Sequence, residues 1–223
     1  MFRILVADDH EVVRRGVCAL LQSQQDWEVC AEASDGRDAV RKALQLKPDA
    51  VVLDVGMPGL NGLEATRHIL KEHPETRVLI LTLHDSDQIV RDVLNAGARG
   101  FLLKSDAARD LVVAMQALRR GETFFTAKVA SMVLEGFLHG GSRRAENRVQ
   151  LTPREREIIQ LLAEGKSTKE VAVLLGVSVK TAETHRSNIM RKLELHSISD
   201  LVLYAVRNNI VPMATPLPPT SES

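Results

Sequence analysis

Two adjacent carboxylates, Asp8 and Asp9, follow an apolar run near the start of the chain, in the stretch RILVADDHEVV at 3–13. Like charges side by side repel each other and shift each other's protonation, so this pair needs a compensating cation. At the mouth of a buried strand, that cation has to come from the fold or from a ligand. A bound metal ion is one candidate.

The elements that position this pair are short apolar runs, which alternate with amphipathic helical patterns over the first half of the chain. The runs are ILVA at 4–7, WEVCAEA at 27–33, AVVLD at 50–54, RVLILT at 77–82 and GFLLK at 100–104. The helical patterns cover about 10–22, 36–45, 62–72, 87–95 and 107–120. Parallel strands need crossover connections, and runs such as AVVL are apolar on both faces. The alternation therefore predicts an α/β fold with a doubly wound, five-stranded parallel sheet.

Polar residues stand where four of these runs end. Ligands of such sheets bind beyond the carboxyl ends of the strands, so five side chains are expected at one edge: Asp8, Asp9, Asp54, Thr82 and Lys104. Carboxylates suit Mg²⁺, and a metal, an ammonium and a hydroxyl together stabilise the equatorial oxygens of a phosphoryl group in transfer. One carboxylate of the set could act as the nucleophile, because aspartate forms acyl phosphates.

The stretches VADDH, VVLDVGMPGLNG, LILTLHD and GFLLK together resemble the receiver domain of bacterial two-component response regulators. The resemblance implies that Asp54 accepts a phosphoryl group from a phosphohistidine of a sensor histidine kinase. It also implies that Asp9, Asp54 and the carbonyl of Gly56 bind Mg²⁺ directly, with Asp8 assisting through water.

Further roles follow from the same resemblance. Lys104 is expected to pair with the phosphoryl oxygens, Thr82 to move toward them, and Phe101 to follow inward as the aromatic switch residue. Two departures from the family pattern bear on the chemistry. Gly56 offers no side chain over the site, and the bulky Leu83 follows Thr82 where receivers often carry a small residue.

The histidines do not predict a metal site. His68 and His73 stand five residues apart on a helix, which is not the spacing of three or four that places two ligands on one face. His10 follows the acid pair and could touch the site, but a surface residue at a helix start is the simpler interpretation.

Beyond residue 150 the sequence is helical in pattern. A hydroxyl N-cap with an acid three residues later occurs in TPRE at 152–155, STKE at 167–170 and SISD at 197–200, and a further helix starts at Ser178. The segment LLGVS at 174–178 contains Gly176, which suits the corner of a helix-turn-helix. On the helix expected at 178–194, Val179, Ala182, Ile189 and Leu193 share one face and leave a polar face opposite.

That polar face alone would more often be a solvated surface than a nucleic-acid reader. The stretches LTPREREI, EGKSTKEVA, LGVSVKTAETHRSNIMRKL and DLVLYAVRN, however, resemble a LuxR-type helix-turn-helix domain. With a receiver, this is the NarL/FixJ-like class of response regulators. The resemblance implies that Glu183, Thr184 and Ser187 lie nearest the bases in the major groove. Phosphate contacts are expected from Lys180, Thr181, Arg186, Asn188, Arg191 and Lys192. His185 is interpreted as structural, and the helix with Leu201, Val202, Tyr204 and Ala205 as a dimer contact.

The expected organisation has four parts: a receiver at 1–122, a linker at 123–150 with a helix at 128–138, a DNA-binding domain of four helices at 151–211, and a disordered tail at 212–223. Acids exceed cations by three over 1–124, and cations exceed acids by three from 125 onward, for a net charge of zero. This weak asymmetry suits an acidic regulatory half and a nucleic-acid-binding half.

Composition sets outer limits. Hydrophobic residues at 44% and charged residues at 26% are ordinary for a globular protein. Cys18 and Cys30 are expected to fill core space rather than to form a disulfide. Neither a membrane span nor a signal peptide is apparent, so a cytoplasmic location is expected.

The function predicted is that of a transcription factor, not an enzyme, in which Mg²⁺-dependent phosphorylation of Asp54 controls dimerisation and binding to double-stranded DNA. One alternative is a magnesium phosphatase with Asp54 as covalent nucleophile, which needs a second acid and a substrate cap. Another is a regulator triggered by a small molecule in the first domain, which needs an apolar pocket where the strand ends supply charges.

Overall fold

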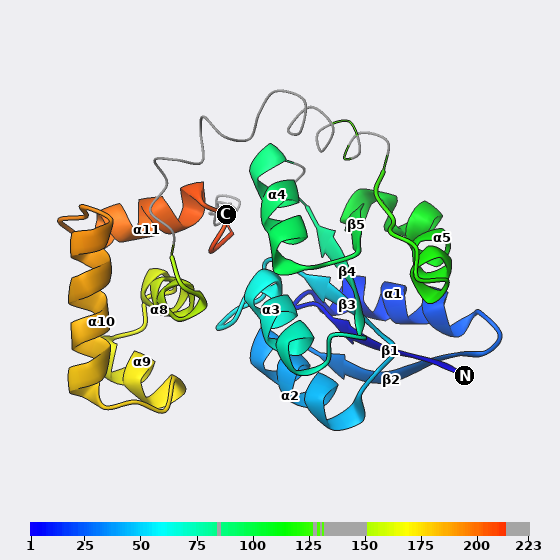
Figure 1. Ribbon diagram of the computed structural model, residues 1–223, viewed down its shortest axis with the longest axis horizontal. Coiled ribbons are helices and arrows are strands. Elements are labelled where there is room, and N and C mark those ends of the chain that lie inside the picture. The colour runs from blue at the N-terminus through cyan, green and yellow to red at the C-terminus, as the bar shows by residue number, and fades with distance from the viewer. Residues whose placement is uncertain (84–85, 127–128, 130, 132–150, 213–223) are drawn as a thin grey trace, which may run out of the picture.

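The computed structural model describes residues 1–83, 86–126, 129, 131 and 151–212, which form a sheet-containing domain followed by a helical domain (Figure 1). Most of the helix expected at 128–138, apart from residues 129 and 131, and the tail after Pro212 lie outside the described residues. No helix among the described residues is long and apolar enough to cross a membrane.

Five strands form the sheet: β1 (Phe2–Ala7), β2 (Trp27–Ala33), β3 (Ala50–Asp54), β4 (Arg77–Thr82) and β5 (Gly100–Leu103). All neighbouring pairs are parallel, and the order across the sheet is β2-β1-β3-β4-β5. The strand order reverses between β1 and β3, and at such a switch point the carboxyl ends of the strands border a crevice. The predicted α/β class and parallel sheet are confirmed.

Helices cover both faces of this sheet: α1 (Glu11–Gln22), α2 (Gly36–Leu46), α3 (Gly62–Glu72), α4 (Asp87–Ala96) and α5 (Ala107–Arg119). The buried side chains of α2, α3 and α4 join one hydrophobic core, and those of α1 and α5 join the other on the opposite face. The predicted elements are confirmed with small shifts at their ends. The first strand begins earlier, at Phe2, and Lys104 leaves the last strand to begin a short 3₁₀ turn.

The start of α3 is fixed by two local features. Asn61 is its N-cap, and its side chain accepts a hydrogen bond of 2.9 Å from the backbone N–H of Glu64. Gly62 packs so closely on the end of β3 that a Cβ there would lie 2.1 Å from the carbonyl oxygen of Asp54. The loop between β3 and α3 is therefore held tightly at the place where Asp54 emerges.

Four helices form the second domain: α8 (Pro153–Ala163), α9 (Thr168–Leu174), α10 (Val179–Lys192) and α11 (Ile198–Arg207). The three predicted capping motifs are present as capping boxes, on Thr152, Ser167 and Ser197. One compact core joins all four helices. Of the residues predicted to share the apolar face of α10, Ala182 and Ile189 are buried, whereas Val179, the first residue of the helix, is 39% exposed.

Candidate functional site

Polar residues meet at the carboxyl edge of the sheet, as the strand pattern predicted. Asp8 and Asp9 directly follow β1, Asp54 and Thr82 end β3 and β4, and Lys104 follows β5. Asp8, Asp54 and Thr82 are almost fully buried, whereas Asp9 keeps about a third of its side chain exposed. The edge therefore has buried acids at its floor and one acid open to solvent.

Lys104 lies between two of these acids. Its Nζ is 2.8 Å from Oδ2 of Asp8 and 2.9 Å from Oδ2 of Asp54, and its side chain is only 5% exposed. The ammonium therefore bridges the ends of β1 and β3, the strands at the switch point. Removing it would leave two carboxylates buried beside each other without a counter-charge.

The protonation of this cluster follows from its burial. Burial raises the pKa of Asp54 to about 6; the charge of Asp8 acts in the same direction, while Lys104 and the backbone N–H of Gly56 oppose the rise. Burial alone would lower the pKa of Lys104, but its contacts with Asp8 and Asp54 outweigh that effect, so the pKa lies above its ordinary value. Lys104 is therefore charged at neutral pH.

A divalent cation fits the donor set of this edge. Asp8, Asp9, His10 and Asp54 each present one ligand atom, and these atoms all lie within 4.8 Å of one another. Three carboxylates face the single ammonium of Lys104, which leaves an excess of negative charge. Oδ2 of Asp8 is buried without a well-aligned hydrogen bond. Hard oxygen donors with spare charge suit Mg²⁺.

His10 lies at the rim of this cluster. It is the exposed N-cap of α1, as expected for a helix-start residue, but its Nδ1 also lies 2.7 Å from Oδ1 of Asp9. Its backbone N–H donates to Oδ1 of Asp8 at 2.8 Å. The alternative that His10 touches the site is thus the one that the structure favours.

The remaining residues expected around the site divide by exposure. Phe101 is fully buried in the core, and Thr82 is almost fully buried. Leu83 is 67% exposed, so its side chain stands in solvent at the end of β4. Gly56 has its backbone N–H directed at the Asp54 carboxylate. The structure thus brings Asp8, Asp9, Asp54, Gly56 and Lys104 together, whereas Phe101 lies in the core and Leu83 in solvent.

Helix α10 presents the polar face expected of a groove-reading helix. Lys180, Thr181, Glu183, Thr184, Arg186, Ser187, Asn188 and Arg191 are all exposed, and His185 is half-buried. Lys192 differs, because its Nζ lies 2.7 Å from Oε2 of Glu155 and the side chain is held against α8. The DNA-facing role assigned to Lys192 therefore has a competing contact within the domain.

Comparisons with known proteins decide the family. Residues 4–116 match the model of the response regulator receiver domain, and residues 149–205 match the model of the LuxR family of bacterial regulatory proteins. The transcriptional regulatory protein LiaR of Bacillus subtilis is 41% identical over 211 residues, which is 95% of this chain and all of that protein. This chain is a response regulator of the NarL/FixJ-like class.

Two further proteins resemble this regulator over most of its length. The oxygen regulatory protein NreC of Staphylococcus aureus is 39% identical over 214 residues, which is 94% of this chain and 99% of that protein. RcsB from Salmonella enterica serovar Typhimurium, solved bound to promoter P1flhDC with the phosphomimetic BeF3⁻, aligns with a TM-score of 0.60 at 26% identity. That alignment covers 91% of this chain and 97% of RcsB.

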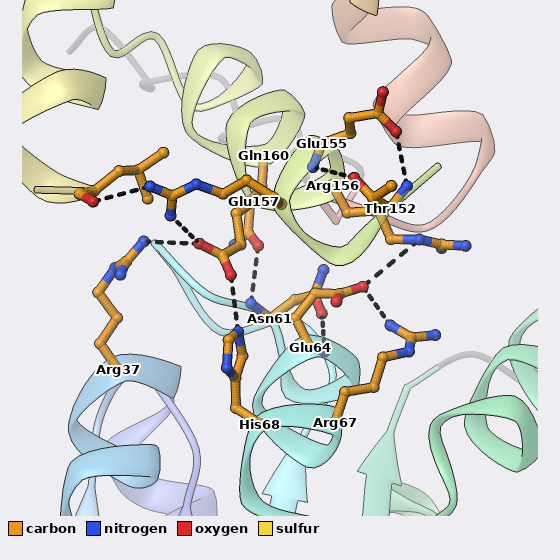
Figure 2. A network of polar contacts seen from close by, with 12 residues as sticks. Arg37, Asn61, Glu64, Arg67, His68, Thr152, Glu155, Arg156, Glu157 and Gln160 are labelled. Atoms are coloured by element: carbon orange, nitrogen blue, oxygen red, sulfur yellow. Dashed lines mark hydrogen bonds and ion pairs between the residues drawn. The ribbon is translucent and has the colours of Figure 1, made fainter. Parts of the chain in front are cut away.

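Sequence reasoning missed a set of polar residues that joins the two domains of the regulator (Figure 2). His68 of α3, to which the sequence assigned no role beyond excluding a metal site, has its Nε2 2.8 Å from Oε1 of Glu157 of α8. Gln160, also on α8, is 1% exposed and bonds to the backbone of the β3–α3 loop. One signal was available: two polar residues three positions apart interrupt the apolar pattern of α8.

Proposed function

We propose that Asp54 accepts a phosphoryl group from a phosphohistidine of a sensor histidine kinase. The observation that carries this proposal is the position of Lys104, whose ammonium lies 2.9 Å from Asp54 and 2.8 Å from Asp8 in a buried, acid-rich edge. A carboxylate oxygen of Asp54 forms a bond to phosphorus as the nitrogen–phosphorus bond of the donor breaks. The imidazole nitrogen leaves with the electron pair.

The residues around Asp54 have distinct parts in this transfer. Lys104 neutralises charge that develops on the phosphoryl oxygens, and the hydroxyl of Thr82 donates to them. Asp9, Asp54 and the carbonyl of Gly56 would hold Mg²⁺, with Asp8 assisting. The ion supplies charge compensation for the phosphoryl oxygens when bound.

The output is sequence-specific binding of duplex DNA by α10. The exposed side chains of Glu183, Thr184 and Ser187 read base edges, while the flanking cations and short polar side chains contact phosphates. A homodimer reads two half-sites about one helical turn apart. Support comes from RcsB, which was solved as two dimers bound to two parallel DNAs. Leu201 and Ala205 of α11, expected at the dimer contact, are instead fully buried in the core of their own domain, so we place the pairing surface of this helix at the exposed Leu203.

Phosphorylation switches this output by changing the populations of two arrangements. Transfer to Asp54 places a phosphoryl dianion beside Thr82 and Lys104, and the loop after β4 and Phe101 follow. The same site hydrolyses its own acyl phosphate, and no other catalysis is proposed. We propose boundaries at residues 122, 150 and 211 for the receiver, the linker and the DNA-binding domain, and a cytoplasmic location.

The decisive test is phosphorylation by an authentic histidine-kinase donor in Mg²⁺, followed by peptide mass spectrometry. Wild type should gain one phosphoryl group on Asp54, Asp54→Asn should gain none, and DNA affinity should rise in wild type alone. Asp110→Asn, on α5 and paired with the neighbouring Arg109 among the residues that the structure describes, is the matched control and should be labelled normally. Labelling of another residue in wild type would contradict the proposal.

A further inference from the structure

The DNA-binding domain forms hydrogen bonds with the loop that follows Asp54, and this set of bonds is called the grip below. The side-chain amide of Gln160 donates from Nε2 to the carbonyl of Met57 at 3.0 Å, and its Oε1 accepts from the backbone N–H of Asn61 at 2.8 Å. Four residues later, at the C-cap of α8, the carboxylate of Glu164 accepts from the backbone N–H of Gly59 at 2.9 Å. Three backbone groups of a five-residue stretch, 57–61, are thus satisfied by another domain.

The gripped loop is the one that contacts the phosphoacceptor. At its start, the N–H of Gly56 is directed at the Asp54 carboxylate. At its end, the side chain of Asn61 donates from Nδ2 to the carbonyl of Ile210 at 3.3 Å, so the segment after α11 touches the loop as well. Gln160 is therefore linked to Asp54 through a few residues of tightly bonded backbone.

The segment after α11 also borders the open space at Gly56. A Cβ placed on Gly56 would lie 3.6 Å from Oδ2 of Asp54 and 4.0 Å from Cγ of Pro212. The space left by the missing side chain is thus bounded by the phosphoacceptor on one side and by the DNA-binding domain on the other. A phosphoryl group on Asp54 has to be accommodated beside this space.

Ion pairs beside these hydrogen bonds join α8 to α2 and α3 of the receiver (Figure 2). On α8, Oε1 of Glu157 lies 2.8 Å from Nε2 of His68 on α3, and its Oε2 lies 3.8 Å from Nη2 of Arg37 on α2. In the opposite sense, Arg156 of α8 lies 3.7 Å from the buried Glu64 of α3. Acids of each domain meet cations of the other, so the contact has a defined register.

The contact leaves the DNA-reading face free. The polar residues of α10 are exposed while α8 is docked on the receiver. Docking in this regulator therefore does not work by covering the groove-reading helix. Its direct target is the loop beside Asp54.

We propose that Gln160 is a positioning residue for the phosphoacceptor loop, and that from the DNA-binding domain it holds this loop in its unphosphorylated arrangement and so opposes phosphorylation of Asp54. The inference rests on the proposed function of Asp54. Phosphorylation removes the free carboxylate that accepts from Gly56 and adds bulk next to Pro212, so it weakens the grip. Linkage makes the effect reciprocal: the factor by which docking weakens phosphoryl binding equals the factor by which phosphorylation weakens docking.

The test compares full-length wild type with Gln160→Met, which keeps the length of the side chain and removes its polar atoms. The first measurement is the equilibrium affinity for beryllium fluoride in Mg²⁺, as a mimic of the phosphoryl group. Loss of two interdomain hydrogen bonds should tighten this affinity about tenfold. The second is hydrogen exchange of the backbone amides at 57–61, which should become faster without the mimic. Gln116→Met, an exposed position on α5, should change neither measurement.

A second pair of variants protects the test against misfolding of Gln160→Met. Glu164 is exposed, so its substitution leaves the core of α8 intact. Glu164→Gln keeps an acceptor for the N–H of Gly59 and should behave as wild type, whereas Glu164→Ala should tighten binding of the mimic severalfold. A merely structural role for this surface side chain would not separate the two.

The outcomes are distinct. Faster exchange at 57–61 with tighter binding of the mimic supports the inference. Faster exchange with unchanged or weaker binding overturns it, and so does unchanged exchange, because the grip would then be absent in solution. Failure of wild type and Gln116→Met alike to bind the mimic would overturn the proposed role of Asp54 itself, and the inference with it.

Discussion

Two clusters of buried charge in this regulator have opposite balances. At the strand ends, Asp8 and Asp54 share the ammonium of Lys104 and Asp9 lies beside them, so acids exceed lysines and arginines within this cluster. Between the domains, cations exceed acids: Glu64 and Glu157 are surrounded by Arg37, Arg67, His68, Arg154 and Arg156. The first cluster has the negative charge that the proposed binding of a cation and a phosphoryl group requires, while the second pairs each acid with cations, including one from the other domain. The two clusters therefore differ in the sign of their excess charge: the strand-end cluster has spare negative charge, and the interdomain cluster does not.

The largest expected effect on stability comes from Lys104→Met in the strand-end cluster. It removes the cation from between two buried carboxylates, and breaking a buried pair in this way costs about 3–5 kcal/mol. Denaturant unfolding without Mg²⁺ at pH 7 should show this loss of stability, and added Mg²⁺ should restore part of it. Lys71→Met, at an exposed position on α3, should change stability by less than about 0.5 kcal/mol. Equal stability of the two variants would remove the case for an acid-rich edge held by one ammonium.

Gly62→Ala tests how tightly the strand-end site and the gripped loop are coupled. A Cβ at this position would meet the carbonyl oxygen of Asp54 at 2.1 Å, so the end of β3 or the start of α3 has to shift. Overpacking of this kind costs about 1–3 kcal/mol. Gly16→Ala is the matched control, because nothing lies within 4 Å of a Cβ there and α1 should gain stability. Unfolding experiments that rank the two variants in the reverse order would contradict the close approach.

The domain contact should depend on pH through His68. The hydrogen bond and charge of Glu157, together with the charge of Glu64, raise the pKa of His68, while burial and Arg37 act against the rise. A raised pKa means that the charged pair supports docking below the ordinary histidine pKa of about 6.5, and that this support is lost as the pH rises through the raised value. Small-angle X-ray scattering from pH 6 to 8 should show the regulator becoming more extended.

Two histidine variants sharpen this prediction. His68→Gln retains a donor for Glu157 but does not titrate, so its scattering should be nearly constant over the same range. His73→Gln, at the C-cap of α3 and without a contact to α8 among the described hydrogen bonds and ion pairs, should keep the wild-type pH dependence. A pH response retained in His68→Gln and lost in His73→Gln would assign the effect to the wrong histidine.

The smallest change in stability is expected for Leu83→Ala. The side chain is 67% exposed, so truncation should alter the free energy of unfolding by less than about 0.5 kcal/mol. Its effect should appear in the phosphorylation rate, because we expect a bulky residue after Thr82 to hinder the approach of a phosphodonor to Asp54. Phosphorylation by acetyl phosphate should be severalfold faster in Leu83→Ala than in wild type, measured by phosphoprotein electrophoresis. Equal rates would show that access is limited elsewhere, with the docked domain as the next candidate.

The two clusters also differ in how far the sequence predicts them. The strand-end site could be predicted because parallel strands bring their carboxyl ends to one edge, so Asp8, Asp54 and Lys104 needed only their strands to be placed. The pair of His68 and Glu157 depends on how two separately folding domains dock, which no local pattern encodes. The capping boxes were predicted because they are local, whereas the exposure of Val179 was not, because helix periodicity says nothing of where the neighbouring core ends.

The freedom of α10 has a consequence for how this regulator searches a genome. Its cations and short polar side chains are exposed. With α10 as the proposed DNA-reading helix, the unphosphorylated protein is expected to bind duplexes weakly and in a salt-sensitive way through their phosphates. Protein already bound non-specifically to chromosomal DNA would need less time to reach a promoter after phosphorylation. Response time would then be set by the arrival of the phosphodonor rather than by diffusion through the cell.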